Sequence, residues 1–177
     1  LAMINTFIAT AAATLAWSLL EGIQRGKASM LGAASGMVTG LVAVTPACGT
    51  IGPMGAIALG VLAVLACYFF VTVVKAKFKY DDSLDVFGIH GVGGIVGALG
   101  TGIFSAATFG GVKGGDYAIA SQTLIQFEAV AITVIWTAVV SFVLFKLIDM
   151  TIGLRVDSDA ERQGLDLSSH GESAYHG

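Results

Sequence analysis

Charged residues are scarce in this sequence. Only 12% of its 177 residues are Asp, Glu, Lys or Arg, whereas an ordinary soluble domain carries about 25%. Hydrophobic residues make up 55% of the chain, and the mean hydropathy is +0.84. Several apolar runs approach the ~20 residues that a helix needs to cross a bilayer. The composition therefore argues against a soluble enzyme and indicates a polytopic membrane protein.

Cysteine, proline and clustered basic residues are also rare. Cys48 and Cys67 lie in or beside apolar runs without CxxC spacing, which excludes a disulfide scaffold or zinc site, and we expect Cys67 to be a small buried hydrophobe. The two prolines and the lack of a Gly-x-y period exclude collagen-like and disordered chains. The net charge is −3 and the sequence has no basic cluster, so it lacks the basic patch that is typical of nucleic-acid-binding proteins. No phosphate loop, activated nucleophile or metal cluster is recognisable, so we expect no cofactor and no enzyme activity.

Five apolar stretches predict five helices, at Leu1–Leu20, Leu31–Thr45, Met54–Val74, Leu84–Ser105 and Gln122–Ile148. Of the nine Lys and Arg residues, all but Lys113 fall on one side of these helices, and the positive-inside rule makes that side cytoplasmic. We predict an all-α transmembrane bundle over residues 1–148 and a cytoplasmic tail over residues 149–177. Because the sequence enters an apolar run at once, without a charged leader, we expect a fragment of a longer protein.

Two of the predicted helices carry regularly spaced glycines. The rows are Gly32, Gly36 and Gly40, and Gly91, Gly94, Gly97 and Gly100. Small residues let membrane helices approach closely, so packing is expected for most of them, although the second row would also leave room for a narrow path. Between the second and third helices, Thr45–Gly49 forms a Gly/Pro-containing break without charge. Such a break is typical of transporter binding regions, and an ordinary tight outer loop is the alternative.

His90 is the most informative residue. It lies inside the fourth apolar stretch, and ionisable residues in membrane helices frequently mark ion or proton routes. An uncharged imidazole both donates and accepts hydrogen bonds, and Val86 and Gly94 share its helix face, so this face is a candidate pore lining. The alternative is a structural histidine bonded to a carbonyl of a neighbouring helix.

The remaining polar residues have less specific interpretations. Asp81, Asp82, Ser83 and Asp85 precede the fourth helix, where capping is expected, and Asp85 lies about 500° of helical rotation from His90, which disfavours a pair. For Glu128 we expect pairing at the membrane interface. In the tail, Ser158–Glu161 matches a capping box and Gly164 a helix end. His170 and His176 have no cysteine nearby, so a metal site is not expected.

These motifs resemble the ammonium transporters of the Amt/Mep/Rh superfamily, bacterial-type Amt branch. Residues 82–102, DSLDVFGIHGVGGIVGALGTG, are similar to the family's tenth transmembrane helix, and residues 44–49, VTPACG, to its junction between helices eight and nine. The tail segments GLRV (153–156), GLD (164–166) and HGE (170–172) are similar to its regulatory terminus. The resemblance covers nearly the whole chain and implies the second part of an eleven-helix inverted-repeat fold, helices seven to eleven plus the tail.

The resemblance also implies roles for single residues. His90 corresponds to the second of two pore histidines, Val86 to an apolar pore-lining position, and Thr45 is placed at the outer vestibule. The implied regulatory residues of the tail are Gly153, Arg155, Gly164, Asp166, His170 and Glu172. The first histidine, the aromatic gate and the ammonium-recruiting residues belong to upstream helices, so this fragment is not expected to transport alone.

The implied function is ammonium transport across the cell membrane by a homotrimer. Ammonium loses a proton at the outer mouth, ammonia passes through a hydrophobic pore, and a PII-type nitrogen regulatory protein binds at the cytoplasmic face. Two other classes stay open. One is an ammonium sensor that signals through its tail, and the other is a purely structural helix bundle.

Overall fold

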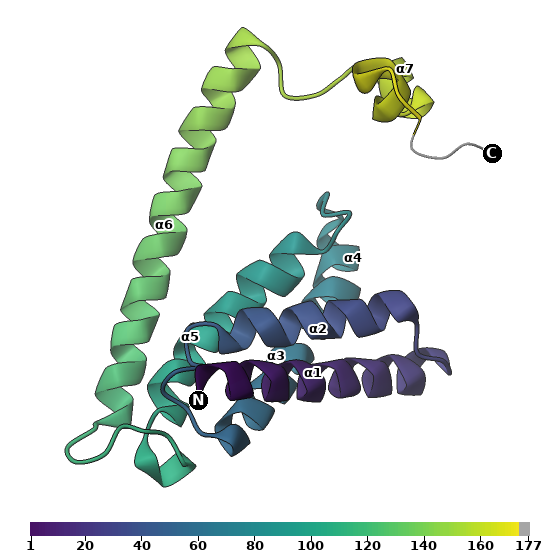
Figure 1. Ribbon diagram of the computed structural model, residues 1–177. Coiled ribbons are helices and arrows are strands. Elements are labelled where there is room, and N and C mark those ends of the chain that lie inside the picture. Colours follow the sequence, from purple (N-terminus) through teal and green to yellow (C-terminus); the bar gives the residue numbers. More distant parts are fainter. Residues whose placement is uncertain (174–177) are drawn as a thin grey trace. The chain divides into compact units, whose positions relative to one another are not determined.

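The computed structural model describes residues 1–173, which are helical apart from turns and loops and include no strand, only an isolated bridge between Ala106 and Lys113. The elements (Figure 1) are α1 (Ala2–Arg25), α2 (Met30–Val44), α3 (Pro53–Phe69), η1 (Phe70–Val74), α4 (Lys75–Phe78), η2 (Phe87–Gly91), α5 (Val92–Phe104), η3 (Ala107–Phe109), α6 (Ile119–Thr151), α7 (Ser158–Gln163) and η4 (Asp166–His170). The chain divides into two compact units, Leu1–Ala131 and Ile132–Gly177, and α6 runs through the boundary.

Four helices in the described part of the chain are long and apolar enough to cross a membrane. They are Ala2–Arg25, Pro53–Phe78, Phe87–Phe104 and Ile119–Thr151. The fifth, α2, has 15 residues and spans only about 22 Å at 1.5 Å per residue. The all-α fold and the five predicted helices are thus confirmed.

Four helices differ from the prediction by two or more residues at an end, among them the third, which continues beyond Val74 to Phe78. The first helix continues beyond Leu20 to Arg25 and ends at Gly26, whose φ of 80° is the left-handed conformation that glycine adopts freely. The fourth starts at Val86, not Leu84, and the fifth extends to 33 residues. At the first, third and fifth helices, residues expected to lie in loops continue the helix, whereas at the fourth Leu84 lies in the preceding loop.

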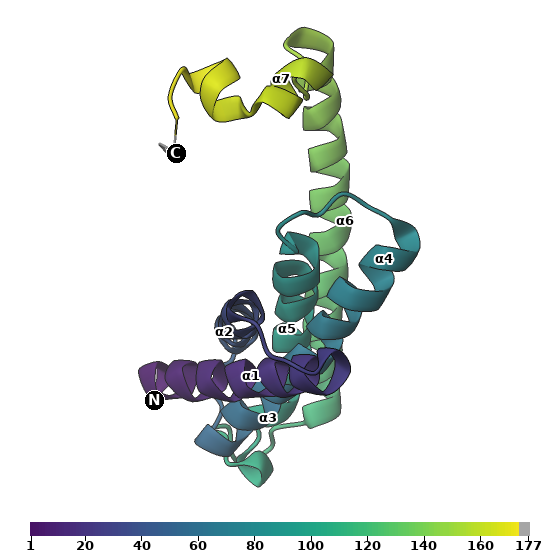
Figure 2. The same ribbon diagram turned by 90° about the vertical axis from the view of Figure 1, so that its right-hand side faces the viewer.

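In the first unit, α1 packs against α2 and α3 (Figures 1 and 2), and glycines make this close approach possible. A Cβ atom on Gly40 of α2, or on Gly60 of α3, would lie 2.7 Å from the backbone oxygen of Ala9 in α1. On Gly36 it would lie 2.8 Å from the Trp17 Cβ. The first predicted glycine row is therefore a packing surface, and Ala9 is held between two helices.

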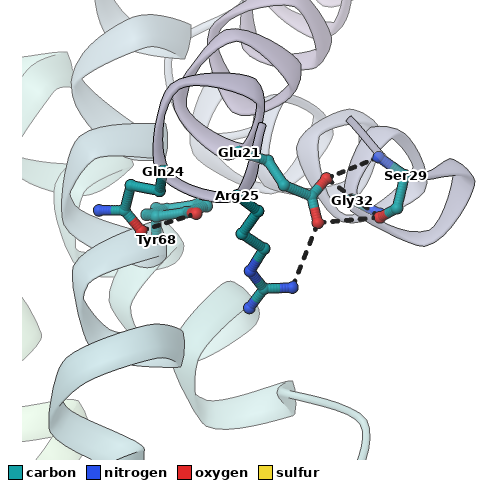
Figure 3. Close-up of polar contacts among 6 residues, drawn as sticks. All are labelled: Glu21, Gln24, Arg25, Ser29, Gly32 and Tyr68. Carbon is teal, nitrogen blue, oxygen red and sulfur yellow. Dashed lines mark hydrogen bonds and ion pairs between the residues drawn. The ribbon is translucent and has the colours of Figure 1, made fainter. Parts of the chain in front are cut away.

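A buried carboxylate joins the end of α1 to the start of α2 (Figure 3). The side chain of Glu21 is 5% exposed and lies 3.4 Å from the Arg25 guanidinium. It accepts hydrogen bonds from the Ser29 backbone N–H at 2.9 Å and from the Ser29 hydroxyl at 2.9 and 3.0 Å. The Ser29 hydroxyl in turn accepts from the Gly32 N–H at 2.9 Å. Glu21 and Ser29 thus cap α2, whose positive dipole end favours a carboxylate.

We expect Gly32→Ala to destabilise this end of the bundle. The new methyl group would occupy the space of the Glu21 carboxylate and lie 3.1 Å from the Ser29 hydroxyl oxygen, and a lost helix cap costs about 1 kcal/mol. The matched control is Gly22→Ala, because nothing in the described structure lies within 4 Å of that position. Thermal unfolding in detergent measures the difference, and equal midpoints for the two variants would contradict the capping role.

Candidate functional site

His90 lies in η2, a five-residue π-helical segment that opens the helix continued by α5. Its side chain is exposed, and within residues 1–173 it makes no hydrogen bond. Val86 is 52% exposed, and a Cβ on Gly94 would meet nothing within 4 Å in the described chain. One face of this helix therefore carries the exposed His90, the half-exposed Val86 and Gly94, beside which residues 1–173 leave open space. No helix carbonyl among the described residues fastens the imidazole.

Neighbouring positions around the same helix are packed. A Cβ on Gly100 would lie 2.5 Å from Leu59 Cδ1, and on Gly93 3.4 Å from the Cys67 sulfur. At Gly97 it would meet the backbone of Ala43, 3.0 Å from Cα. The second glycine row is therefore not one stripe, since Gly97 and Gly100 serve packing whereas Gly94 faces open space. Cys67 is fully buried, as the sequence predicted.

The loop before His90 is held by charged residues in two different ways. Asp82 caps the helix by accepting from the N–H groups of Val86 at 2.7 Å and Phe87 at 3.0 Å, which is the predicted role. Asp85 was expected to cap as well and does not do so. Its carboxylate lies 2.7 Å from the Lys75 ammonium group, and Lys75 also donates to the Asp82 carbonyl. Asp85 has a φ of 56°, a conformation that aspartate tolerates and that this ion pair holds in place.

The π-helical geometry around His90 was not visible in the sequence. Such segments are rare in proteins overall, and those that occur are often at functional sites. The apolar pattern of residues 84–105, however, fits an ordinary α-helix equally well. Asp85 precedes the helix, so the predicted separation of Asp85 from His90 along a regular helix does not apply. The two residues remain unpaired, because Asp85 turns to Lys75.

Hydrogen bonds join the break after α2 to two other parts of the protein. The Asn5 side chain donates to the carbonyls of Cys48 at 2.8 Å and Ile51 at 2.7 Å. The hydroxyls of Thr50 and Ser105 lie 2.7 Å apart, which links the break to the end of α5. These bonds satisfy irregular backbone of the kind that lipid does not tolerate. Asn5 was missed by sequence reasoning, although a lone amide in an apolar run is the signal that would have found it.

Thr45 and Glu128 are both exposed in the structure. Thr45 is exposed, and its hydroxyl donates to the Leu41 carbonyl at 2.6 Å. Glu128 is exposed on α6. In residues 1–173 no three His, Cys, Asp or Glu side chains are placed to hold a metal ion.

The second unit contains a short ordered tail. The cap of α7 is Asp157, not Ser158 as predicted, and its carboxylate accepts from the N–H groups of Asp159 and Ala160. Gly164, with a φ of 95°, ends α7 as predicted. Gly153, another of the predicted tail residues, has a φ of 80°. His170 is the last residue of η4, and the Asp166 backbone carbonyl accepts a hydrogen bond from the Glu172 N–H at 2.9 Å. His176 lies outside the described residues.

The Arg155–Glu161 pair gives the tail a pH dependence. Hydrogen bonds and charge from Arg155, 2.7 Å away, lower the pKa of the Glu161 carboxyl. A lowered folded-state pKa means that the pair contributes stability above the ordinary glutamate pKa and loses it as pH falls through the lowered value. We expect a carboxyl NMR titration to give Glu161 a pKa below the ordinary glutamate value, and Arg155→Gln to raise that pKa toward the ordinary value. An ordinary pKa for Glu161 in the unmodified chain would contradict the pair.

Comparison with known proteins agrees with this architecture. The family model described as Ammonium Transporter Family matches residues 1–175. An ammonium transporter from Aquifex aeolicus is 47% identical over 99% of this chain and 41% of its own length, and one from Bacillus subtilis is 42% identical over 98% and 44%. The chain thus spans less than half the length of these relatives.

Solved structures of Mep2 and Amt proteins share the fold of this chain. Mep2 of Saccharomyces cerevisiae superposes with a TM-score of 0.79 and 31% identity, over 89% of this chain and 37% of that chain. A structure titled "Sensor Amt Protein" has a TM-score of 0.82 and 25% identity, over 96% and 41%. The family consists of transporters, not enzymes, and its members are multi-pass membrane proteins. From the sequence relatives and the shared fold, this chain belongs to the ammonium transporter family.

Proposed function

We propose that this chain is the C-terminal part of an ammonium transporter and that His90 lines its permeation path. The single observation that carries the proposal is one face of η2 and α5, where the exposed His90 lies with the half-exposed Val86 and with Gly94, beside which the described chain leaves open space. An ionisable residue in a membrane span ordinarily faces protein or a hydrated path. Segments upstream of this chain would cover this face and complete the path.

The chemistry of the face suits ammonia better than a hydrated cation. Moving a bare cation into apolar surroundings costs far more than moving a neutral molecule, so ammonium loses a proton at the outer mouth. The imidazole of His90, paired with a histidine from the upstream half, then exchanges hydrogen bonds with ammonia, while apolar groups such as Val86 exclude hydrated metal ions.

The assembly and orientation belong to the same proposal. The charged end of the first unit carries Arg25, Lys27, Lys75, Lys77 and Lys79. Because basic residues are enriched on the cytoplasmic side of membrane proteins, this end faces the cytoplasm in our proposal, and the membrane is the cell membrane. The tail follows into the cytoplasm, where Gly153, Arg155, Gly164, Asp166, His170 and Glu172 form a regulatory surface for neighbouring subunits of a homotrimer and for a PII-type protein. Thr45 lies at the outer vestibule.

A sensor is the second candidate, favoured by the similarity to the structure titled "Sensor Amt Protein" and by the ordered tail. In that case wild-type protein would show negligible uptake, and ammonium would change the protease sensitivity of the tail.

Methylammonium uptake by the full-length protein in proteoliposomes tests the proposal. We expect His90→Ala to lower uptake per folded transporter at least about tenfold, equivalent to ~1.4 kcal/mol of barrier. Gly22→Ala is the control, since it adds a methyl group where the described chain has open space. Unchanged uptake in His90→Ala would remove His90 from the path.

A further inference from the structure

Two π-helical segments lie against each other beside His90. One is η2, which contains His90, and the other is η1, which interrupts the helix Pro53–Phe78. The rings of Phe70 in η1 and Phe87 in η2 meet edge to face with centroids 6.1 Å apart. Since π-helical turns are rare in proteins, two such segments in direct contact call for a physical reason.

The two segments also lie close together at Gly88. A Cβ atom on Gly88 would lie 2.7 Å from Cγ2 of Val71, but 3.6 Å or more from the Val71 backbone. Only hydrogen at Gly88 therefore fits the present spacing. Because valine has a stiff side chain with few accessible rotamers, the Val71 methyl group cannot move aside cheaply.

A second contact holds the same turn from inside the bundle. The Cys67 sulfur, one turn before Val71, lies 3.8 Å from the Ile89 carbonyl oxygen, to which the thiol donates. Ile89 is 5% exposed and packs in the core cluster with Trp17, Tyr68 and Val92. Residues 88 and 89 are thus fixed on the buried side, and His90 follows directly on the open side.

We infer that Gly88 and Val71 are positioning residues for His90, because their contact holds the π-helical turn that aims the imidazole along the open face. A π turn accommodates about one residue more than an α turn. If the two segments are forced apart, the turn loses the support that selects this register and the imidazole changes direction. The inference rests on the proposed role of His90 in permeation and adds the residues that set its geometry.

The test uses full-length protein in proteoliposomes and the variants Gly88→Ala, Val71→Ala and the double variant. We expect Gly88→Ala to lower the maximal methylammonium uptake rate per folded transporter at least about tenfold, because small misplacements of a reacting group have large rate effects. The half-saturating concentration stays within about twofold, since upstream residues recruit the substrate. In the double variant the lost Cγ2 restores the space, so the maximal rate recovers to within about threefold of wild type.

Several results would overturn the inference. They are a wild-type maximal rate in Gly88→Ala, a maximal rate and half-saturating concentration that change together, or a double variant no better than the single one. If Gly88→Ala does not fold, Cys67→Ala adds no atoms and serves instead. It removes the thiol contact with Ile89, and an unchanged maximal rate in that variant overturns the inference. His90→Ala in the same assay keeps the two questions apart, since unchanged uptake there refutes the permeation role itself.

Discussion

Gly94→Val abolishes most methylammonium uptake while leaving the protein folded, if the open face of α5 lines the path. In the described chain no atom lies within 4 Å of a Cβ at Gly94, and four residues along the helix from His90 the new side chain stands on the same side. Two added methyl groups and a Cβ would narrow the path where ammonia must pass. We expect a loss of at least about tenfold, which requires only ~1.4 kcal/mol of added barrier.

The control for this experiment is thermal unfolding of the same preparation. An unfolding midpoint close to that of wild type together with lost uptake is the expected combination. A large drop in the midpoint would show that a neighbouring helix of the complete protein packs on Gly94, and unchanged uptake would show that the path lies elsewhere. Either result contradicts the assignment of this face.

Gly97→Ala has the opposite expected outcome, a loss of stability. A Cβ at Gly97 would lie 3.0 Å from the carbonyl carbon and from Cα of Ala43 in α2. These are backbone atoms, so no side-chain rotation relieves the contact and the two helices must separate. Overpacking of a core costs about 1–3 kcal/mol, and we expect a backbone clash to fall at the upper end.

The measurement is thermal unfolding in detergent, with Gly94→Ala as the matched control one turn earlier on the same helix. Gly97→Ala should unfold several degrees below wild type, whereas Gly94→Ala should not. If both variants unfold like wild type, α2 and α5 are not in backbone contact and the packing described here is wrong.

Hydrophobic pattern predicts much of this fold. Long apolar runs separate five helices from their loops, and regular spacing identifies Gly36 and Gly40 as close-packing positions. The ends of helices are less predictable, because they depend on individual hydrogen bonds and ion pairs that the apolar pattern does not contain. Glu21 lies in a helix because Ser29 and Arg25 stabilise its carboxylate, and no periodicity contains that information.

The site is predictable in identity but not in geometry. A single histidine in an apolar span is recognisable in the sequence as a candidate functional residue, and the motif around it matches the family. Asp82 caps the helix, whereas Asp85 pairs with Lys75. These different roles depend on which of the two carboxylates reaches a lysine on another helix. Asn5 and the π-helical turns likewise follow from tertiary contacts, not from local sequence preferences.

The most direct measurement is an experimental structure of the complete assembly at a resolution that shows side chains. We expect a continuous narrow passage bordered by His90, Val86 and Gly94, with the imidazole within hydrogen-bonding distance of the space inside it. An imidazole bonded to a backbone carbonyl and sealed from any passage would contradict the permeation role of His90, although the family assignment would stand.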